Sequence, residues 1–487
     1  MGRLKFRLGF LRKKQFLMIF VLAFLIIINI DLFAKEKETF TIALTGKYPP
    51  FNFYSDEGKL VGFDVDTAKK ISKHLNRKLV IIPTEWDSIV AGLLFKKYDA
   101  IIGSMAITPE RAKKVNFSIP YYISGAQLFI HKRNREKIKK ITDLYGKKVG
   151  VGLGETYEHY LRKNHPSIKI VTYKSTVDIF MDMHNNRLDG FLTDRLVGLY
   201  QIKKGHMPFI PAGQLLYEEK MAIPVTINNT ELLTNINKAL KRMKEDGTSA
   251  KLHKKWFGSA SVSDPKAERD MRTEVIIKKL AQGFAITLFV AFISILFGFI
   301  LSVPSGIILN SKKTFLYHIL RSSNDIIRGT PLLIQLFFVY FGAPQIGITL
   351  APIQAAIITL TINSSAYMSE VIRSGLMAVD HGQNLAGKAL GLTKLQVFRY
   401  VIWPQSFRVS LPPLVNSVVA LMKDTALIAM ISVGEVIRET QSIISVTYNP
   451  IKYYFIVGAM FFVFTFPLMK MANKLEKNIK ERGFTHA

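Results

Sequence analysis

The order of hydrophobic and polar residues divides this 487-residue chain into two parts of different character. Between residues 38 and 262, short β-branched runs such as "KLVIIPT" and "DAIIGSM" alternate with amphipathic stretches such as "DVDTAKKISKHLN". The runs are typical of buried strands, and the amphipathic stretches are typical of surface helices. Their alternation predicts an α/β architecture with largely parallel sheets.

The second part of the chain is dominated by apolar segments. The polar stretch "SASVSDPKAERD" precedes them and predicts a linker over residues 259–275. Several of the apolar segments are long enough to cross a bilayer. Five such segments lie at about residues 282–309, 331–345, 350–369, 411–432 and 452–471. They predict an all-α domain with five transmembrane helices. Lys423 and Asp424 interrupt the fourth segment, and as ionisable residues in an apolar segment they need either other partners or a helix break.

The first 34 residues have the order of an export signal. The basic stretch "MGRLKFRLGFLRKK" is followed by the apolar run "FLMIFVLAFLIIINI". Cleavage after Ala34 and retention as an uncleaved signal anchor both stay open, because Leu32 is large for a cleavage site and the apolar run is long. Either alternative sends residues 38 onward out of the cytoplasm.

The positions of the basic residues predict the topology. They gather in two predicted inner loops and in the C-terminal tail, whereas the outer loop "APQIGITL" has none, and cytoplasmic loops carry such an excess. These residues are Lys312, Lys313, Arg321, Arg328, Arg373, Lys388, Lys394, Arg399, Arg408, Lys474, Lys477, Lys480 and Arg482. We therefore expect a multi-pass protein of the bacterial inner membrane, with residues 38–258 on the outer face and a cytoplasmic C-terminus.

Charge and cysteine content exclude several classes of function. The net charge of +30 comes without a basic recognition helix or a basic patch interleaved with aromatic residues, so we expect no nucleic-acid binding. The absence of cysteine excludes disulfides, thiolate metal sites, cysteine nucleophiles and a lipid anchor on an N-terminal cysteine. We expect no catalytic residue, no metal site and no cofactor held by this chain.

The stretch "GQNLAGKAL" at residues 382–390 is similar to a phosphate-binding loop but lacks its context. Such a loop follows a strand, and a Ser or Thr follows its lysine to hold Mg²⁺. Here Ala389 follows Lys388, and the preceding "MSEVIRSGLMAVDH" is helix-like. ATP and Mg²⁺ are therefore expected on another subunit.

Two strand-to-helix turns carry candidate anion-binding groups. In "SMAITPERAKK", Thr108 is a candidate N-cap, and Arg111 would present a bidentate guanidinium to a carboxylate. The alternative is a surface arginine that pairs with Glu110. The glycine-rich turn "GVGLGET", which ends at Thr156, would offer backbone amides to an anion.

Three further side chains are candidates for the rest of a zwitterionic ligand. Asp194 in "FLTDRL" would accept an ammonium group, and the alternative is that it caps a helix. Tyr48 in "KYPPFNF" and Trp86 in "TEWDSI" would enclose an aliphatic side chain, and the alternative is a place in the core.

Together these stretches resemble the family 3 extracellular solute-binding proteins, the amino-acid receptors of ABC importers. The motifs include "YPPFNF", "GFDVDTAKKI", "DAIIGSMAITPER" and "KEDGTSAKLHKKWFG", while "YYISGAQL", "GKKVGVGLG" and "TDRL" are most similar to the cystine-binding branch. The resemblance implies a two-lobed α/β periplasmic-binding-protein fold that closes over its ligand at two crossover strands. Lobe 1 would comprise residues 38–123 and 224–258, and lobe 2 residues 126–220.

The same resemblance assigns roles to individual residues. Arg111, Ser104 and the Thr156 turn would hold the α-carboxylate, Asp194 the α-ammonium, and Tyr48 and Trp86 the side chain. The sequence departs from the family pattern at Thr67, where an aliphatic residue is usual, and at Ala106, where a hydroxyl is common. It also has Thr45 where receptors for basic side chains often place a carboxylate, which disfavours a Lys or Arg ligand.

Residues 277–478 resemble the polar amino-acid ABC permeases of the histidine/glutamine type. The motifs are "RGTPLLIQLFFVYFG" and the stretch from "GQNLAGKALGL" through "IWPQSFRVSLPPLVNS" to "MKDTALIAMISVGE". The resemblance implies a cytoplasmic coupling loop, about residues 371–410, that docks on a separate ATPase subunit. Leu385, Ala386 and Gly387 occupy the Glu-Ala-Ala positions of that loop, and Gly391 follows at the expected spacing.

The sequence therefore predicts a receptor fused to its own permease, which imports a polar amino acid with ATP hydrolysed elsewhere. L-Cystine is the first expectation, and glutamine, glutamate or polar amino acids in general are the alternative. A homodimer with two ATPase subunits is expected, and a second permease partner stays open. A ligand-gated channel, a transmembrane sensor and an enzyme on the receptor fold are the more distant alternatives.

Overall fold

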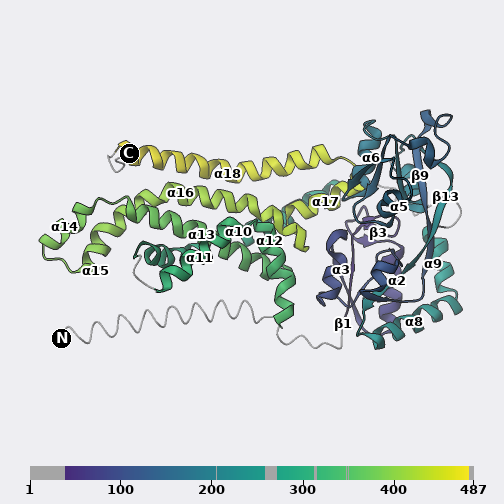
Figure 1. Cartoon of the computed structure of the whole chain (residues 1–487), viewed down its shortest axis with the longest axis horizontal. Coiled ribbons are helices and arrows are strands. Elements are labelled where there is room, and N and C mark those ends of the chain that lie inside the picture. The colour runs from purple at the N-terminus through teal and green to yellow at the C-terminus, as the bar shows by residue number, and fades with distance from the viewer. Residues whose placement is uncertain are drawn as a thin grey trace.

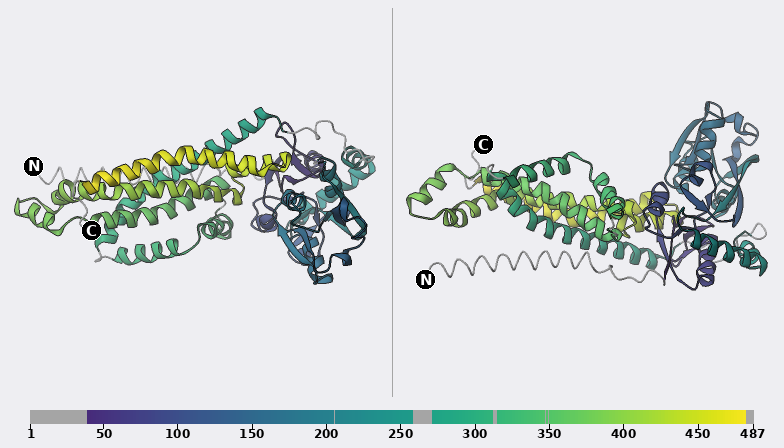
Figure 2. Two further views of the ribbon diagram at one scale, coloured as in Figure 1. Left: turned by 90° about the horizontal axis from the view of Figure 1, so that it is seen from above. Right: turned by 60° about the horizontal axis from the view of Figure 1, so that its bottom comes forward.

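The computed structural model describes residues 39–204, 206–257, 271–311, 315–346, 348 and 350–481. The predicted export signal at 1–34, the linker up to residue 270, and the basic residues Lys312, Lys313 and Arg482 lie outside these residues. An α/β domain lies at one end of a long helical domain (Figure 1), and two further views show the same arrangement (Figure 2).

Lobe 1 is built on a five-stranded sheet whose strand order is β5-β1-β6-β14-β8. Parallel pairing joins β1 to β5 and β6, and β14 runs antiparallel to β6 and β8. The strands are β1 (Thr39–Leu44), β5 (Lys78–Pro83), β6 (Ala100–Ile101), β8 (Val115–Phe117) and β14 (Pro224–Thr226). Its helices are α2 (Phe63–His74), α3 (Trp86–Leu94), α4 (Pro109–Ala112), α8 (Thr230–Glu245) and α9 (Thr248–Phe257). A small sheet of β2 (Lys47–Tyr48), β3 (Asn52–Tyr54) and β4 (Leu60–Val61) completes the lobe.

Lobe 2 contains a six-stranded sheet of order β11-β10-β12-β9-β13-β7. The strands are β7 (Met105–Ala106), β9 (Tyr122–His131), β10 (Lys148–Gly152), β11 (Lys169–Tyr173), β12 (Gly190–Asp194) and β13 (Phe209–Ala222). Its helices are α5 (Thr156–Asn164), α6 (Thr176–His184) and α7 (Arg195–Lys204), with short 3-10 turns η1 (Lys132–Asn134) and η2 (Ile141–Leu144). The α/β architecture predicted for this part of the chain is confirmed.

Two chain segments cross side by side between the lobes. The backbone N–H of Tyr121 donates to the carbonyl of Met221 at 3.0 Å, and that of Ser118 donates to Ile223 at 2.9 Å. The long strands β9 and β13 therefore extend side by side and antiparallel from lobe 1 into lobe 2. Two adjacent connections of this kind allow the lobes to rotate about one axis, which is how hinge closure around ligands works.

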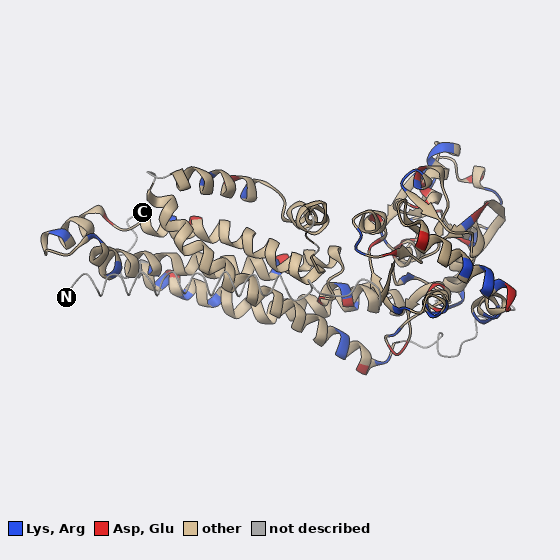
Figure 3. Ribbon diagram, turned by 90° about the horizontal axis from the view of Figure 1, so that it is seen from below, with Lys and Arg blue, Asp and Glu red and all other residues tan. Residues whose placement is uncertain are grey.

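The helical domain consists of long and short α-helices together with short 3-10 and π-helical segments. They are α10 (Thr273–Ser311), α11 (Phe315–Gly329), α12 (Leu332–Phe337), η3 (Phe338–Gly342), η4 (Ala343–Ile346), α13 (Pro352–Met377), α14 (His381–Ala389), α15 (Lys394–Val397), η5 (Phe398–Ile402), α16 (Trp403–Asp424), η6 (Thr425–Ile431), α17 (Val436–Thr447) and α18 (Pro450–Glu481). At Lys423 and Asp424 the α-helix α16 ends and the 3-10 helix η6 continues, and the two belong to one candidate span, Lys394–Ile431. Charged residues are sparser along this domain than over the α/β domain (Figure 3).

The number of membrane spans differs from the simple reading of the sequence. Among the described residues, three helices are long and apolar enough to cross a membrane, and a fourth span arises if the pair Phe315–Gly329 and Leu332–Ile346, bent by 108°, is one span. The remaining predicted segment, 350–369, forms α13, whose buried face includes Thr359, Asn363 and Ser364. These polar groups lower the hydropathy of α13. They are buried, where polar side chains can bond neighbouring helices. The count of five spans stays a prediction.

Small residues allow α10 and α13 to approach closely. A Cβ built on Gly298 would lie 2.2 Å from Oγ of Ser364, and one on Gly306 would lie 2.7 Å from Ile372. Any larger side chain would force the two helices apart. This is the small-residue packing that brings helices together in lipid, where apolar burial alone does not favour one helix contact over another.

Candidate ligand-binding site

A cleft lies between the two lobes. Lobe 1 and the start of β7 contribute Thr45, Lys47, Tyr48, Glu85, Trp86, Gly103, Ser104, Ala106 and Arg111, and lobe 2 contributes Gly152, Glu155, Thr156, Tyr157, Tyr173, Lys174, Ser175, Thr176, Glu219 and Met221. Five of the six predicted ligand residues, Tyr48, Trp86, Ser104, Arg111 and Thr156, therefore meet in one cavity although up to 108 positions separate them in the sequence. Sites between two domains are common places for small ligands.

Arg111 is held in the cleft by the local structure around it. The side chain of Thr108 accepts the backbone N–H of Arg111 at 3.2 Å, which caps the short helix α4 as predicted. The guanidinium Nη1 donates to the carbonyl of Ala106 at 3.0 Å, and Nη2 donates to Gly154 of lobe 2 at 3.4 Å. Burial lowers the pKa of Arg111 from its usual value, but nearby carboxylates oppose the change. A cation in this position can pair with a ligand carboxylate.

Trp86 and Tyr48 form the aromatic wall of lobe 1. Trp86 is the first residue of α3, and its ring centroid lies 5.4 Å from the guanidinium carbon of Arg111. Tyr48 ends β2, and its ring stacks on Phe51 with centroids 5.7 Å apart. Both rings also line the cleft, so they offer flat apolar surfaces beside a cation.

Ser104 borders the cleft with its polar groups already bonded. Its hydroxyl donates to both oxygens of Asp64, at 3.1 and 3.0 Å, and its backbone N–H donates to Oη of Tyr121 at 3.0 Å. The backbone has the left-handed conformation, with φ of 52°. Burial raises the pKa of Asp64 to about 6, although Tyr121, Asn52 and Ser104 donate to its carboxylate. Asp64 thus fixes the turn that carries Ser104, and carboxylate binding by Ser104 stays a prediction.

The glycine-rich turn of lobe 2 brings a carboxylate into the cleft. Glu155 precedes Thr156 at the start of α5, and a Cβ on Gly152 would lie only 2.1 Å from its Cδ. Glycine at position 152 is therefore required for the Glu155 side chain to fold back over the strand end. Burial raises the pKa of Glu155 to about 7, and the neighbouring Glu219 acts in the same direction.

Asp194 lies beside the cleft and does not line it. Its Oδ1 accepts the backbone N–H groups of Leu196 at 2.8 Å and Val197 at 3.3 Å, and Ser124 donates to its other oxygen. The capping alternative is therefore present in the structure. The side chain is fully buried, and burial raises its pKa to about 7. Binding of a ligand ammonium by Asp194 stays a prediction.

Five charged residues of the cleft were not predicted as ligand residues. They are Lys47, Glu85, Glu155, Lys174 and Glu219. Glu155 lies within the glycine-rich turn "GVGLGET", so its position in that motif could have indicated that it lines the cleft. Glu219 has no such marker, because it becomes part of the cleft only through the crossing of β13. Among the described residues, no group of three or more His, Cys, Asp or Glu side chains is arranged to hold a metal ion.

The predicted coupling loop forms the end of the helical domain opposite the α/β domain (Figure 1). Leu385 is 55% exposed on α14, and Leu390 and Leu395 are also exposed. Gly387 is buried, and a Cβ there would lie 3.0 Å from Val397 of α15. Gly391 has φ of 75° and links the two short helices. Small residues thus hold α14 and α15 together while apolar side chains stay exposed.

Comparisons with known proteins agree with this division of the chain. Residues 40–259 match the bacterial extracellular solute-binding proteins, family 3, and residues 302–481 match the binding-protein-dependent transport system inner membrane component. The L-cystine-binding protein TcyJ of Escherichia coli is 40% identical over 46% of this chain and 85% of its own length. The probable glutamine ABC transporter permease protein GlnP of Bacillus subtilis is 37% identical over 40% of this chain and 92% of its own length. An ancestral arginine-binding protein bound to arginine is 38% identical, with a TM-score of 0.45, over 46% of this chain and 100% of that chain.

Both predicted resemblances are confirmed, and with them the fold class of a two-lobed α/β domain followed by a helical domain. The helical domain and its apolar helices indicate a multi-pass protein of the inner membrane. The two matched families are transport proteins and not enzymes. The chain therefore belongs to the family 3 extracellular solute-binding proteins in its first part and to the ABC inner-membrane permeases in its second, fused as one subunit of an amino-acid transporter.

Proposed function

We propose that this subunit imports L-cystine, with ATP hydrolysed by separate ATPase subunits. The observation that carries the proposal is the arrangement of charges in the cleft. Arg111, Glu155 and Glu219 form one set of interacting charges. Lys47 and Glu85 form a second set on lobe 1, 2.7 Å apart, near the lobe 2 residue Lys174. Cystine carries an ammonium and a carboxylate at each end, so a cleft with two charged regions suits it.

The neighbouring side chains support the same ligand. Trp86 and Tyr48 offer apolar surface for the disulfide and methylene groups of cystine. Lobe 1 has a threonine at position 45 of the cleft, so it offers no carboxylate there to a basic side chain of the ligand. The 40% identity with an L-cystine-binding protein points in the same direction. Glutamine, glutamate or polar amino acids in general form the second candidate, which the similarity of the permease domain to a probable glutamine permease favours.

The helical domain supplies the route across the membrane in this proposal. The binding domain would lie on the outer face, because it is at the opposite end of the helical domain from α14 and α15 (Figure 1). The exposed leucines of α14 and α15 would dock in a groove of the ATPase subunit. ATP-driven closure of two ATPase subunits would then move these helices and change which side of the membrane the pathway faces. Two copies of this chain would provide two permease domains and two binding domains.

Calorimetric titration tests the ligand directly. The full-length chain in lipid nanodiscs is titrated with L-cystine, L-glutamine, L-glutamate and L-arginine. We expect submicromolar cystine binding that Arg111→Ala weakens by at least about 30-fold, since loss of a buried charge partner costs 2 kcal/mol or more. Lys163→Ala on the exposed surface of α5 is the matched control and should bind as the unmodified chain does. Tight binding of glutamine or glutamate in place of cystine would favour the second candidate.

A further inference from the structure

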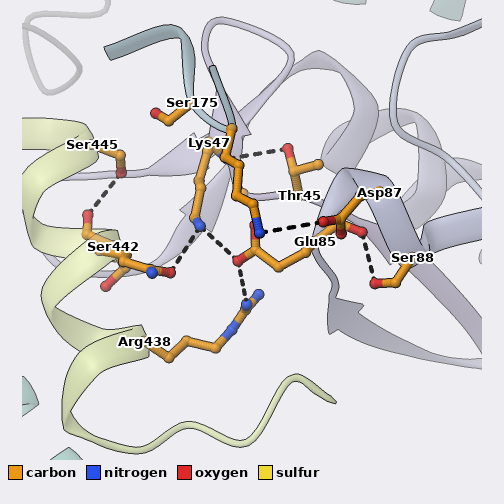
Figure 4. A network of polar contacts seen from close by, with 12 residues as sticks. Thr45, Lys47, Glu85, Asp87, Ser88, Ser175, Arg438, Ser442 and Ser445 are labelled. Carbon is orange, nitrogen blue, oxygen red and sulfur yellow. Dashed lines mark hydrogen bonds and ion pairs between the residues drawn. The ribbon is translucent and has the colours of Figure 1, made fainter. Parts of the chain in front are cut away.

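A charged contact joins the permease domain to the wall of the ligand cleft. Nη1 of Arg438, on α17, lies 2.9 Å from Oε1 of Glu85. Nζ of Lys47 lies 2.7 Å from the same oxygen and donates to Gln441 of α17 at 2.9 Å. Figure 4 shows Arg438 of α17 reaching this carboxylate from the permease side. The three charged side chains, named here the α17 cluster, are Lys47, Glu85 and Arg438.

The α17 cluster is nearly closed to solvent. The side chains of Lys47, Glu85 and Arg438 are 14, 10 and 9% exposed. Because water is largely excluded, their attraction is screened far less than that of a surface pair. Their Coulomb energy varies as 1/r, and with weak screening it changes by more per ångström than it would in water. A small displacement of Glu85 therefore changes the energy of the contact with the permease.

Two members of the α17 cluster also belong to the ligand site. Lys47 and Glu85 line the cleft, so the carboxylate that binds Arg438 stands at the same wall as the ligand. Lys47 and Glu85 thus belong both to the ligand cleft and to the interface with the permease.

Three consecutive residues at the start of α3 each contact a different part of the molecule. Glu85, the N-cap residue, contacts the permease, and Trp86 lines the cleft beside Arg111. Asp87 lies 3.5 Å from Lys174 of lobe 2. The helix is fixed to the core of lobe 1 by Ile89 and Leu93, both fully buried. The permease, the ligand and the opposite lobe therefore all act on one rigid helix end.

We propose that the N-terminus of α3 couples closure of the ligand cleft to the permease through the contact between Glu85 and Arg438. This inference rests on the proposed function, since it requires that the cleft binds an amino acid. Closure brings Lys174 of lobe 2 to Asp87 and fixes the first turn of α3 in the position where Glu85 meets Arg438. Binding energies are linked reciprocally, so the docked α17 also favours the closed, ligand-bound cleft. Arg438 acts here as a positioning residue for the ligand site.

The test compares ligand affinity in full-length variants in nanodiscs, with L-cystine as the probe and L-glutamine where cystine does not bind. We expect Arg438→Gln to weaken binding by about five- to tenfold, which is within the usual range of coupling between sites. Arg438→Lys keeps the charge and should restore most of the affinity. The matched control is Arg272→Gln. Arg272 immediately precedes α10, and its Nη2 lies 3.4 Å from Glu57 of lobe 1, away from the cleft. This variant should bind within about twofold of the unmodified chain.

Hydrogen exchange of α17 provides a readout that a structural role alone would not change. Addition of the amino acid should slow exchange in Val436–Thr447 of the unmodified chain and of Arg272→Gln, but not of Arg438→Gln. Equal exchange of the sheet cores at β1 and β10 in the ligand-free chains shows that each variant is folded. Unchanged affinity and unchanged ligand protection in Arg438→Gln would overturn the coupling while leaving the importer intact. Absence of binding by the unmodified chain would overturn the proposed function, and the coupling with it.

Discussion

The two lobes of the binding domain meet the permease with surfaces of different composition. Lobe 1 contributes charges, in the α17 cluster and in Lys97, whose Nζ donates to the carbonyl of Leu350 at 3.0 Å. It also contributes the aromatic side chains of Tyr54 and Phe95, which pack on the helical domain. Lobe 2 uses apolar residues, because Val177 and Met181 of α6 belong to one cluster with Ile443 and other residues of α17 and α18. Tyr448 also donates a hydrogen bond to Gln201 of lobe 2.

The difference suggests a division of labour between the lobes. Buried ion pairs are directional and fix the relative position of two surfaces. Apolar contacts depend on buried area and tolerate small shifts. Lobe 1 is therefore expected to hold a fixed register on the permease, whereas lobe 2 can adjust its position as the cleft opens and closes.

The largest expected effect comes from a charge placed in the apolar contact of lobe 2. Val177 is 1% exposed, so Val177→Asp would bury an uncompensated carboxylate at a cost of about 3 kcal/mol or more. We expect lobe 2 to separate from the permease, seen as faster hydrogen exchange in α6 and α17. Val177→Ala is the control and should cost about 1.5 kcal/mol through lost apolar burial. Equal exchange in both variants would mean that this surface does not hold lobe 2.

Glu85→Gln tests the charged contact of lobe 1. Without the shared carboxylate, Lys47 and Arg438 become two neighbouring cations in a nearly closed space, which should weaken docking of lobe 1 by about 2–4 kcal/mol. The double variant Glu85→Gln/Arg438→Gln should recover part of this loss, because it removes one of the two cations. Hydrogen exchange of the β2 region reports the docking. Additive losses in the double variant would argue against a shared contact.

A moderate, pH-dependent effect is expected from Asp194 in lobe 2. Its pKa is raised to about 7 by burial, so the carboxyl is partly protonated near neutral pH. A ligand ammonium would favour the ionised form, so binding at pH 6–7 should release a proton. Affinity should therefore fall as the pH decreases from 8 to 6, approaching about tenfold per unit below 7. Calorimetry in two buffers of different ionisation enthalpy measures the released proton, and no release over this range would exclude the ammonium role of Asp194.

The smallest effect is expected from the contact between the lobes at Lys174 and Asp87. Their side chains are 56 and 43% exposed and lie 3.5 Å apart, and exposed pairs contribute about 0–1 kcal/mol. Lys174→Gln should weaken ligand binding by no more than about fivefold. The difference from the unmodified chain should disappear in 0.5 M salt, at which such pairs are largely screened. A loss of tenfold or more would show that Lys174 contacts the ligand itself.

Sequence patterns predicted most of the architecture because strands and amphipathic helices are local features. The turn at Thr108 and Arg111 was also predictable, since a capping residue marks it. The sharp bend between α11 and α12 was not predicted, because apolar length alone does not report direction. The contact of Arg438 with Glu85 at the cleft wall could not be predicted, since the two residues are 353 positions apart.

The shared carboxylate of Glu85 limits how freely the two parts of this chain can be exchanged. If ligand binding and docking use the same side chain, a binding domain taken from another importer would bring its own specificity but lose the contact with Arg438. A chimera would then need Lys47 and Glu85 restored, or α17 exchanged with the receptor. Specificity and docking would be inherited as one module, and fusion in a single gene keeps that module together.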